Sequence, residues 1–419
     1  MKRLVLLFSA WIVWASADAQ LTLEECRRLA GENYPQVRKY GLIEKARAYE
    51  LSNLEKNYWP QLQMSGKATY QSDATKLPID LPGVEFEGLP RDQYQVALEV
   101  QQVLWDGGVV ASGRREVKAA SDVEMEQQRV SMYALNERVD ALFFGILMLD
   151  SRLELNRLLQ DELERTHRRV SAYMANGVAN QSDLDAVSVE RLNAGQQQVE
   201  LETSRKAYVD MLAAFIGKEL PSETTVLQRP LPEEVTALHP NNRPELGLFD
   251  ARNRQLDVQQ SSLKTRFMPS FGLFVQGAYG NPGLNMLEDK FSAYYVAGVR
   301  MSWNFGGLYT LKTDQRKIAN SRLQVETDRD VFLFNTRLDA VRQDAEVISM
   351  KRQMETDDEI IRLRENIRRS AEAKVENGTL TVTDLLDEIT AENQARQTKS
   401  LHEVQLLMYV WQLKQTLNQ

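Results

Sequence analysis

The sequence predicts a mainly α-helical protein that carries two pairs of β-strands of membrane-spanning length and that is internally duplicated. Three observations predict this fold class. The 12 prolines are absent from residues 91–220 and 283–419, and proline is excluded from helix interiors because it lacks an N–H group. The second half of the chain repeats the first at an offset of about 200 residues. Four short segments alternate apolar and polar residues, which is the period of a half-buried strand.

The composition excludes several classes of function. The formal net charge of −8 argues against a nucleic-acid partner, which needs a basic surface. Cys26 is the only cysteine, so the chain forms neither an intrachain disulfide nor a thiolate metal site. His167, His239 and His402 lie far apart, and the sequence has neither a glycine-rich phosphate loop nor a G-x-S-x-G turn. We therefore expect no metal site and no cofactor and single out no catalytic residues, although these counts do not exclude catalysis by isolated Asp or Glu side chains.

Residues 1–19 are predicted to be a signal peptide for export. Lys2 and Arg3 form its basic end, residues 4–14 are apolar except for one serine, and residues 17–19 have the small-x-small pattern that precedes cleavage. The apolar run is too short to span a bilayer as a helix. We therefore expect an exported mature chain.

Two very long helices are predicted, over 108–176 and 307–377. From Leu308 to Asn377 the sequence contains neither proline nor glycine. Because an α-helix rises 1.5 Å per residue, a helix of about 65–70 residues is about 100 Å long. Such a length exceeds a compact domain and indicates a coiled coil or an α-helical barrel.

The duplication sets the predicted domain organisation. In each half a helix (22–58 or 243–267) precedes two strands, the long helix, a glycine turn and a last helix (182–216 or 382–417). The sequence therefore divides into a signal peptide (1–19), a first structural repeat (20–216), an equatorial linker (217–242) and a second structural repeat (243–419).

The four segments with period two, 61–71, 94–104, 270–280 and 292–303, have the length of tilted transmembrane strands. A pair of soluble hairpins packed on a helix is the alternative. Four strands cannot close a barrel, and an open edge is costly in lipid, so membrane strands would have to be pooled by several chains. The loop 72–92 and the loop 281–290 would then lie outside the cell.

At this point the sequence resembles the TolC-like outer-membrane efflux protein family. The resemblance covers the predicted mature chain and rests on matching features in the family's order: Leu21-Thr22-Leu23-Glu24-Glu25 with Leu29-Ala30, Asn33-Tyr34-Pro35, the corners Trp105-Asp106-Gly107-Gly108 and Asn304-Phe305-Gly306-Gly307, and the turns at Gly177 and Gly378.

The resemblance implies a trimeric channel-tunnel, in which a long coiled-coil α-barrel continues a shared 12-stranded β-barrel. It implies an outer-membrane exit duct of a tripartite efflux pump or type I secretion system, with a long periplasmic extension. The implied partners are two further copies of the chain, outer-membrane lipid, a periplasmic adaptor (membrane fusion protein) and an inner-membrane RND, ABC or MFS pump. The duct itself would be passive.

Asp384 and Asp387 are the main candidate site residues. Their i, i+3 spacing places both carboxylates on one helix face, and three chains would bring six of them around one axis, where they attract cations. The resemblance assigns the periplasmic pore aperture to these two residues, with Asp183 and Val375 as secondary candidates. A carboxylate in the first turn of a helix also stabilises the helix dipole, which is the alternative reading of Asp384.

The two glycine turns are the candidate adaptor-docking site by resemblance. Glycine suits the left-handed conformation that ends a helix, and we expect Ser182, and Thr383 or Thr381, to cap the helices that follow. Some family members hold the aperture closed through a tyrosine and an arginine, which Val375 and Leu380 replace here, so closure must rest on other contacts. The docking candidates are Asn176, Gly177, Val178, Asn377, Gly378, Thr379 and Leu380.

Two other functions compete with the duct. The first is a soluble periplasmic coiled-coil or adaptor protein, although adaptors have one helical hairpin rather than two. The second is an exported hydrolase that uses Asp and Glu. The arginines that precede both turns, among them Arg165 and Arg368, are predicted to lie on a solvated helix face.

Overall fold

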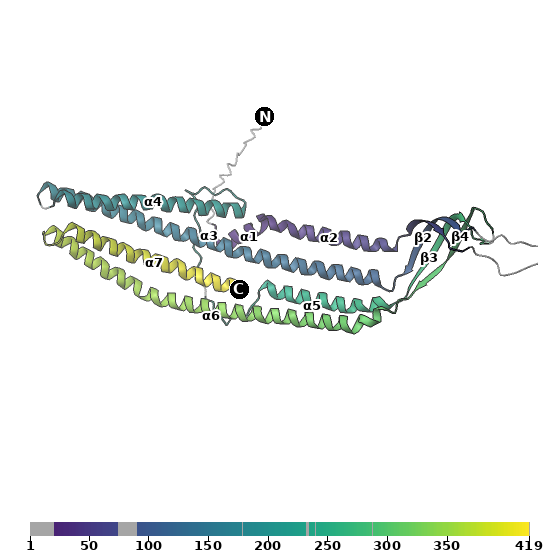
Figure 1. The fold of residues 1–419 in the computed structure, drawn as a ribbon. Coiled ribbons are helices and arrows are strands. Elements are labelled where there is room, and N and C mark those ends of the chain that lie inside the picture. The colour runs from purple at the N-terminus through teal and green to yellow at the C-terminus, as the bar shows by residue number, and fades with distance from the viewer. Residues whose placement is uncertain are drawn as a thin grey trace, which may run out of the picture. The chain divides into compact units, whose positions relative to one another are not determined.

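The structure is a computed structural model that describes residues 21–73, 90–177, 179–231, 234–238, 240–286 and 288–418 (Figure 1). The predicted signal peptide lies outside these residues, as does most of the loop 72–92. The chain forms two compact units. Unit 1 consists of residues up to Val37, Ser131–Arg243 and Leu333–Gln419, and unit 2 of Arg38–Val130 and Pro244–Phe332.

Each unit draws its elements from both repeats. Unit 1 contains α1 (Leu23–Asn33), the 3-10 helix η1 (Pro35–Val37), α4 (Gln181–Ile216) and α7 (Val382–Leu417). Unit 2 contains α2 (Arg38–Glu55), η2 (Lys56–Tyr58), β1 (Gln61–Tyr70), β2 (Asp92–Trp105), α5 (Pro244–Ser262), η3 (Leu263–Phe267), β3 (Ser270–Asn281) and β4 (Ser292–Ser302). The long helices α3 (Val109–Ala175) and α6 (Gly307–Glu376) begin in unit 2 and end in unit 1.

One helix that the sequence predicts as continuous is interrupted in the structure. The segment 22–58 was expected as a single helix, but α1 ends at Asn33 and α2 begins at Arg38. Tyr34 adopts an extended conformation with ψ 127° because the ring of Pro35 disfavours the helical conformation of the residue before it. The long helices and the four strands lie where the sequence predicts them, with ends that differ by at most three residues.

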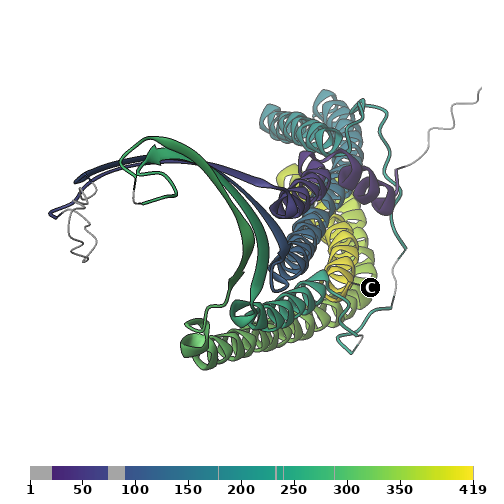
Figure 2. The same ribbon diagram turned by 90° about the vertical axis from the view of Figure 1, so that its right-hand side faces the viewer.

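The four strands of unit 2 form one antiparallel sheet in the order β1-β2-β3-β4. Leu62 pairs with Val100, and Val100 also pairs with Val275, so the apolar positions of neighbouring strands lie on the same face. The central pair, β2 with β3, joins the two repeats. Figure 2 shows that the sheet is strongly curved.

The strand-to-helix corner at Trp105–Gly108 is fixed by its side chains. Gly107 has φ +70°, and a Cβ atom there would lie 2.9 Å from Cβ of Met268. The Asp106 carboxylate accepts hydrogen bonds from the backbone N–H groups of Gly108 and Val110 and from the Tyr58 hydroxyl. Burial opposes the charge of Asp106, but these hydrogen bonds hold the pKa of its carboxyl below the usual value. The corner is thus a cap that starts α3.

Eleven buried or half-buried positions of α6 in unit 1 follow a coiled-coil period. They recur at steps of three, four and seven residues over 40 positions, a heptad pattern that keeps one seam facing a partner helix. The seam consists of Thr336, Ala340, Gln343, Val347, Met350, Met354, Asp357, Ile361, Arg368, Ala371 and Val375.

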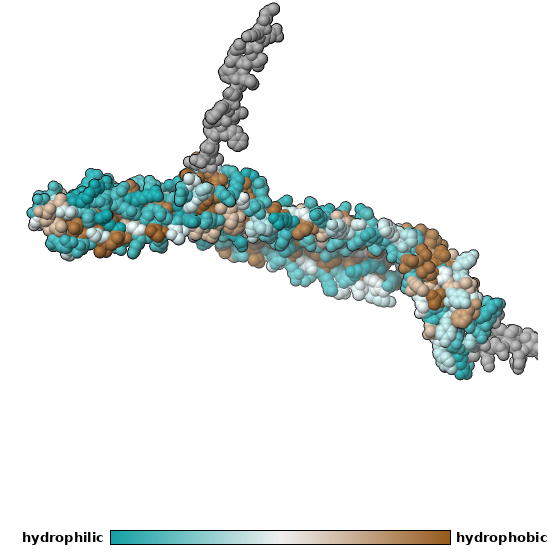
Figure 3. Space-filling view, turned by 90° about the horizontal axis from the view of Figure 1, so that it is seen from above, coloured by the Kyte–Doolittle hydropathy of each residue, from teal (hydrophilic) through white to brown (hydrophobic). Residues whose placement is uncertain are grey.

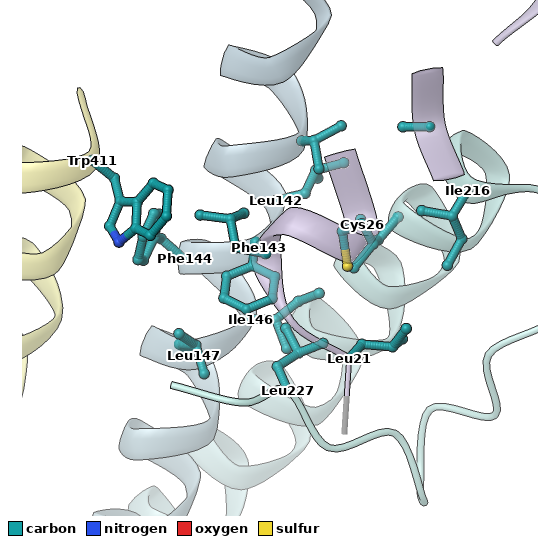
Figure 4. Close-up of a cluster of buried hydrophobic side chains, with 14 of the residues drawn as sticks. Leu21, Cys26, Leu142, Phe143, Phe144, Ile146, Leu147, Ile216, Leu227 and Trp411 are labelled. Atoms are coloured by element: carbon teal, nitrogen blue, oxygen red, sulfur yellow. The ribbon is translucent and has the colours of Figure 1, made fainter. Parts of the chain in front are cut away.

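The main core of unit 1 joins α1, α3, α4 and α7 (Figure 4). Phe143 and Phe144 of α3 are fully buried and meet edge to face, with ring centroids 5.8 Å apart. Cys26 is buried in this cluster, and burial raises the pKa of its thiol to about 12. Cys26 is therefore a packed residue of this core.

The ends of α1 and α4 are joined through Asn33. Its side-chain amide donates hydrogen bonds to the carbonyl groups of Ala214 and Phe215, which end α4, and Gly217 ends that helix with φ +69°. A Cβ atom at Gly217 would lie 2.4 Å from the Asn33 side chain. The Asn33-Tyr34-Pro35 motif therefore terminates two helices at one point.

Gly145 is expected to be essential for the packing of α3 against α4. A Cβ atom at this position would lie 2.4 Å from the Tyr208 ring. Gly145→Ala is predicted to lower the free energy of unfolding by about 1–3 kcal/mol through overpacking, despite the better helix propensity of alanine. Gly31→Ala is the matched control, since a Cβ atom there meets nothing within 4 Å, and it should stabilise α1 by about 0.5–1 kcal/mol. Thermal unfolding followed by circular dichroism measures both; equal effects would contradict the packing argument.

Candidate functional site: the helical turns and the sheet

The two turns of unit 1 have the same geometry. Gly177 and Gly378 have φ +74° and +67°, which is the left-handed conformation predicted for them. Asn176 and Asn377 each donate a side-chain hydrogen bond to the carbonyl group four residues earlier. Thr379 closes the second turn through its backbone N–H to Lys374 O, at 2.8 Å. Leu380 is half-buried, and Val178 lies outside the described residues.

The helix after each turn begins with a capping box. In α4 the side chain of Asn180 accepts from the Asp183 N–H, and the Asp183 carboxylate accepts from the Asn180 N–H. Thr381 and Asp384 do the same in α7. The predicted caps Ser182 and Thr383 are wrong, because each helix begins before them; the alternative, Thr381, is confirmed.

The structure separates the roles of Asp384 and Asp387. The Asp384 carboxylate also accepts a hydrogen bond of 2.6 Å from the Thr381 hydroxyl, so it is held in the cap. Asp387 is exposed and has no hydrogen bond or ion pair within the described part of the chain. Asp387 is therefore the more available carboxylate. Asp384 and Asp183 are held in capping boxes, which supports the alternative that they stabilise the start of a helix.

An apolar cluster in unit 1 brings both helical hairpins together beside the turns. Val375 is buried in this cluster, which draws residues from all four helices, and Leu380 packs on its edge. The two positions that replace the family's tyrosine and arginine thus contribute apolar contacts. The buried members are Leu163, Val170, Val187, Ala194, Ala371, Val375, Val382, Leu385, Leu386 and Ile389.

A charged network links the same hairpins and includes one arginine predicted to be solvated. Arg368 of α6 contacts Glu392 of α7 at 2.5 Å and Glu162 of α3 at 3.6 Å. Arg396 holds the other oxygen of Glu392. Burial opposes the charge of Glu392, but hydrogen bonds from Arg396 and Arg368 keep the pKa of its carboxyl below the usual value. The sequence could have indicated this network, because Arg368 occupies a position of the α6 heptad that is usually apolar.

The sheet of unit 2 is apolar on its exposed face. The large side chains of this face, called the membrane face below, are between 38% and 76% exposed. The alternate residues form a polar face, where Glu99 and Arg300 pair at 3.0 Å and Gln95 donates to the Tyr294 hydroxyl. Hydrophobic residues gather over the sheet in Figure 3. The membrane face consists of Leu62, Met64, Tyr70, Tyr94, Val96, Leu98, Val100, Leu273, Val275, Tyr279, Tyr295, Val299 and Met301.

An exposed apolar sheet face is the reverse of the pattern in a water-soluble sheet, where the apolar face is covered. No helix in the described ranges combines the length and the apolar composition needed to cross a membrane. Residues 27–218 match the family model of the outer membrane efflux protein. The match covers 192 of the 419 residues, so the chain resembles this family through its first repeat.

Solved channels share the fold of this chain. The Campylobacter jejuni CmeC channel is 13% identical, with a TM-score of 0.63, over 94% of this chain and 85% of that chain. Vibrio cholerae VceC is 12% identical with a TM-score of 0.62, over 94% of each chain. The open Neisseria gonorrhoeae MtrE channel is 14% identical with a TM-score of 0.63, over 94% and 88%. No curated protein sequence matches the chain.

These findings confirm the predicted channel-tunnel fold class, the outer-membrane localisation and the non-enzymatic character. The match supports an exit duct of efflux systems in the outer membrane, and channels of this family work with an adaptor and an inner-membrane pump. The family match disfavours the soluble coiled-coil and hydrolase alternatives.

Proposed function

We propose that three copies of the chain assemble into one duct, in which their sheets form a 12-stranded barrel across the outer membrane. The observation that carries this proposal is the membrane face, because its exposed side chains alternate in register with a polar face over all four strands. Lipid covers an apolar face at no cost, and water inside a barrel suits the polar face.

The sheet edges support pooling of strands between copies. β1 pairs only with β2, and β4 pairs only with β3, among the described strands. Each chain therefore has two edges of unpaired backbone groups, which cannot remain open in lipid. Pairing β4 of one copy with β1 of the next closes both.

Exposed apolar seams on α4 and α6 support the same assembly in unit 1. α4 exposes Val189, Leu192 and Val199, and α6 exposes a matching series that includes Leu363, whereas α7 has no exposed large apolar residue. In Figure 1, α4 and α6 are the outermost helices of this unit. Besides the residues that it buries within the chain, each of these two helices thus has an exposed apolar row that needs a partner helix. We propose that α4 of one copy packs against α6 of the next.

A disulfide between copies tests this packing. Leu192 lies 11 residues after the start of α4 at Gln181, and Leu363 lies 13 residues before the end of α6 at Glu376. A rotation about an axis along the helices keeps these heights, so the two side chains come level to within about 3 Å. Leu192→Cys combined with Leu363→Cys should therefore give a covalent trimer on oxidation, detected by non-reducing electrophoresis.

The control pair for this experiment is Leu192→Cys with Ile348→Cys. Ile348 is exposed on α6 as Leu363 is, but it lies 15 residues farther from the turn, about 22 Å along the helix. Cys26 is buried and does not compete for oxidation. Equal cross-linking of the two pairs, or none in either, would contradict the proposed register.

We propose that Asp387 and Asp384 from three copies line the periplasmic aperture, with Asp387 contributing more to ion selectivity. The support is the free carboxylate of Asp387, set against the capped carboxylate of Asp384. The turns at Asn176–Gly177 and Asn377–Leu380 are the proposed adaptor-docking site, and an RND, ABC or MFS pump would supply the substrate. The apolar cluster and the Arg368 network are proposed to hold the aperture closed in place of the family's polar links.

Single-channel recording in planar bilayers tests the aperture. One charge about 8 Å from a passing ion contributes about 0.5 kcal/mol in water, with opposite signs for cations and anions, so removing three charges by Asp387→Asn should lower the cation-to-anion permeability ratio by more than about tenfold. Asp384→Asn should change the ratio less, and it should weaken the start of α7 by about 1 kcal/mol. Asp210→Asn, an exposed carboxylate far along α4, is the control. An unchanged ratio in Asp387→Asn would remove this residue from the aperture.

A further inference from the structure

A basic collar surrounds the point where the helices of unit 2 meet the sheet. The collar comprises residues 53–59, 104–116, 264–268 and 303–317, with eight basic and four acidic side chains. Its net charge is therefore +4, within a chain whose net charge is −8. The remainder of the chain carries −12, so the collar is a local reversal of sign.

The four collar segments are physically joined. Gly107 lies so close to Met268 that a Cβ atom on the glycine would be 2.9 Å from Cβ of Met268, so the second and third segments touch. The Trp303 indole donates a hydrogen bond of 3.0 Å to Phe267 O, which joins the third and fourth segments. Tyr58 binds Asp106, which joins the first and second segments. Basic residues that are far apart in sequence thus form one surface at one edge of the sheet.

Several collar cations are available to a ligand. Lys56, Lys264 and Lys312 are exposed. Within the described residues, Lys264 and Lys312 have no acidic partner, and Lys56 contacts only Asn53, at 3.4 Å. Arg266 and Arg114 are paired with Asp314 and Glu55. Three lysines of the collar therefore keep an uncompensated charge.

Exposed aromatic side chains lie between these lysines and the membrane face. Trp105 stacks on Phe271 with ring centroids 5.9 Å apart, Trp303 meets Phe305 in a tilted arrangement at 4.8 Å, and both tryptophans remain exposed. Tryptophan is enriched at the level of lipid headgroups because its ring is apolar and its N–H is polar. The order along the surface is thus apolar face, aromatic belt and cations, which is the order of acyl chain, interface and phosphate in a lipid leaflet.

We propose that the basic collar binds the anionic phosphate headgroups of phospholipids in the periplasmic leaflet of the outer membrane. The proposal rests on the placement of the sheet in that membrane. Cations near an anionic lipid surface favour it by electrostatic attraction, and each lysine contributes about fivefold to the local preference. The collar then fixes the depth of the duct and selects anionic over zwitterionic lipid.

Energy transfer from the belt tryptophans to labelled lipid tests the proposal. The purified trimer is reconstituted in phosphatidylcholine vesicles that contain either dansyl-phosphatidylglycerol or dansyl-phosphatidylcholine. The wild type should give stronger transfer to the anionic probe, and high salt should reduce the difference because the lysines are exposed. The variant Lys56→Gln/Lys264→Gln/Lys312→Gln should lose at least fivefold of this preference.

The control variant is Lys39→Gln/Lys45→Gln/Lys351→Gln, which removes three exposed lysines outside the collar and should keep the wild-type preference. Inorganic phosphate at matched ionic strength should not compete, since the proposed ligand is lipid. Equal transfer to both probes in the wild type would overturn the headgroup proposal while the membrane placement stands. Absence of transfer to either probe would overturn the membrane placement itself.

Discussion

Met64→Arg should abolish recovery of the protein in the outer membrane. Met64 lies on the membrane face of β1, where its side chain is 74% exposed in the chain. An arginine facing the middle of the bilayer costs about 2–4 kcal/mol in a transmembrane strand, and a trimer would contain three of them. A total of about 6–12 kcal/mol is comparable to the whole stability of a domain. The measurement is the amount of folded protein extracted from outer-membrane fractions with detergent.

Ser65→Arg provides the matched control. Ser65 is the next residue of β1 and is also exposed, but it lies on the polar face. In a water-soluble sheet both arginines would be harmless, because both side chains would meet solvent. In a barrel the control should be recovered at wild-type levels, and similar recovery of the two variants would contradict the assignment of the faces.

Arg27→Met should destabilise unit 1 by about 3–5 kcal/mol. Arg27 of α1 forms two hydrogen bonds with the Asp140 carboxylate of α3, at 2.7 and 2.5 Å, and its guanidinium lies 5.0 Å from the Trp411 ring of α7. The side chains of the pair are 18% and 10% exposed, so removing the arginine leaves a buried carboxylate without a counter-ion. Thermal unfolding in detergent measures the loss at neutral pH.

Arg28→Met is the control for the same helix. Arg28 pairs with Glu32 at 2.9 Å, but both side chains are more than half exposed. Exposed pairs spaced i, i+4 contribute about 0.3–0.5 kcal/mol, so the expected loss is small. A loss in Arg28→Met as large as that in Arg27→Met would contradict the importance of burial.

The loss in Arg27→Met should also depend on pH. Burial raises the pKa of the Asp140 carboxyl above its usual value, against the opposing effect of Arg27. The contribution of Asp140 to stability is therefore complete below its unfolded pKa and declines as the pH rises through its folded pKa. Without Arg27 the folded pKa rises further, so the decline is larger at neutral pH. The deficit of the variant should shrink as the pH falls toward the ordinary range of aspartate.

Much of the fold could be predicted from local patterns. Proline marks where helices cannot continue, and the period of apolar residues separates strands from helices, so the long helices α3 and α6 and all four strands were found close to their observed ends. The break at Pro35 was missed because the helical pattern resumes at once after it. The cap of α4 was placed two residues too late, at Ser182 instead of Asn180, and for α7 the sequence left Thr383 and Thr381 open, because several neighbouring polar residues can serve as caps.

The candidate site was predictable only in part. The turns at Gly177 and Gly378 follow from residue type, since glycine adopts positive φ without strain. The division of labour between Asp384 and Asp387 does not follow, because spacing alone gives both carboxylates the same face. Only the hydrogen bonds of Thr381 show that one of them is held in a cap.

The sequence by itself determined which residues form strands and long helices and that the unit occurs twice, because these properties depend on the chemistry of residues close along the chain. The tertiary structure alone decided which face of the sheet is left exposed, which α6 residues meet Glu162 and Glu392, and how the collar lysines come together. Those properties depend on contacts between separate elements, from 24 positions apart for Arg368 with Glu392 to 206 for Arg368 with Glu162, and the one-dimensional pattern does not specify how such segments pair.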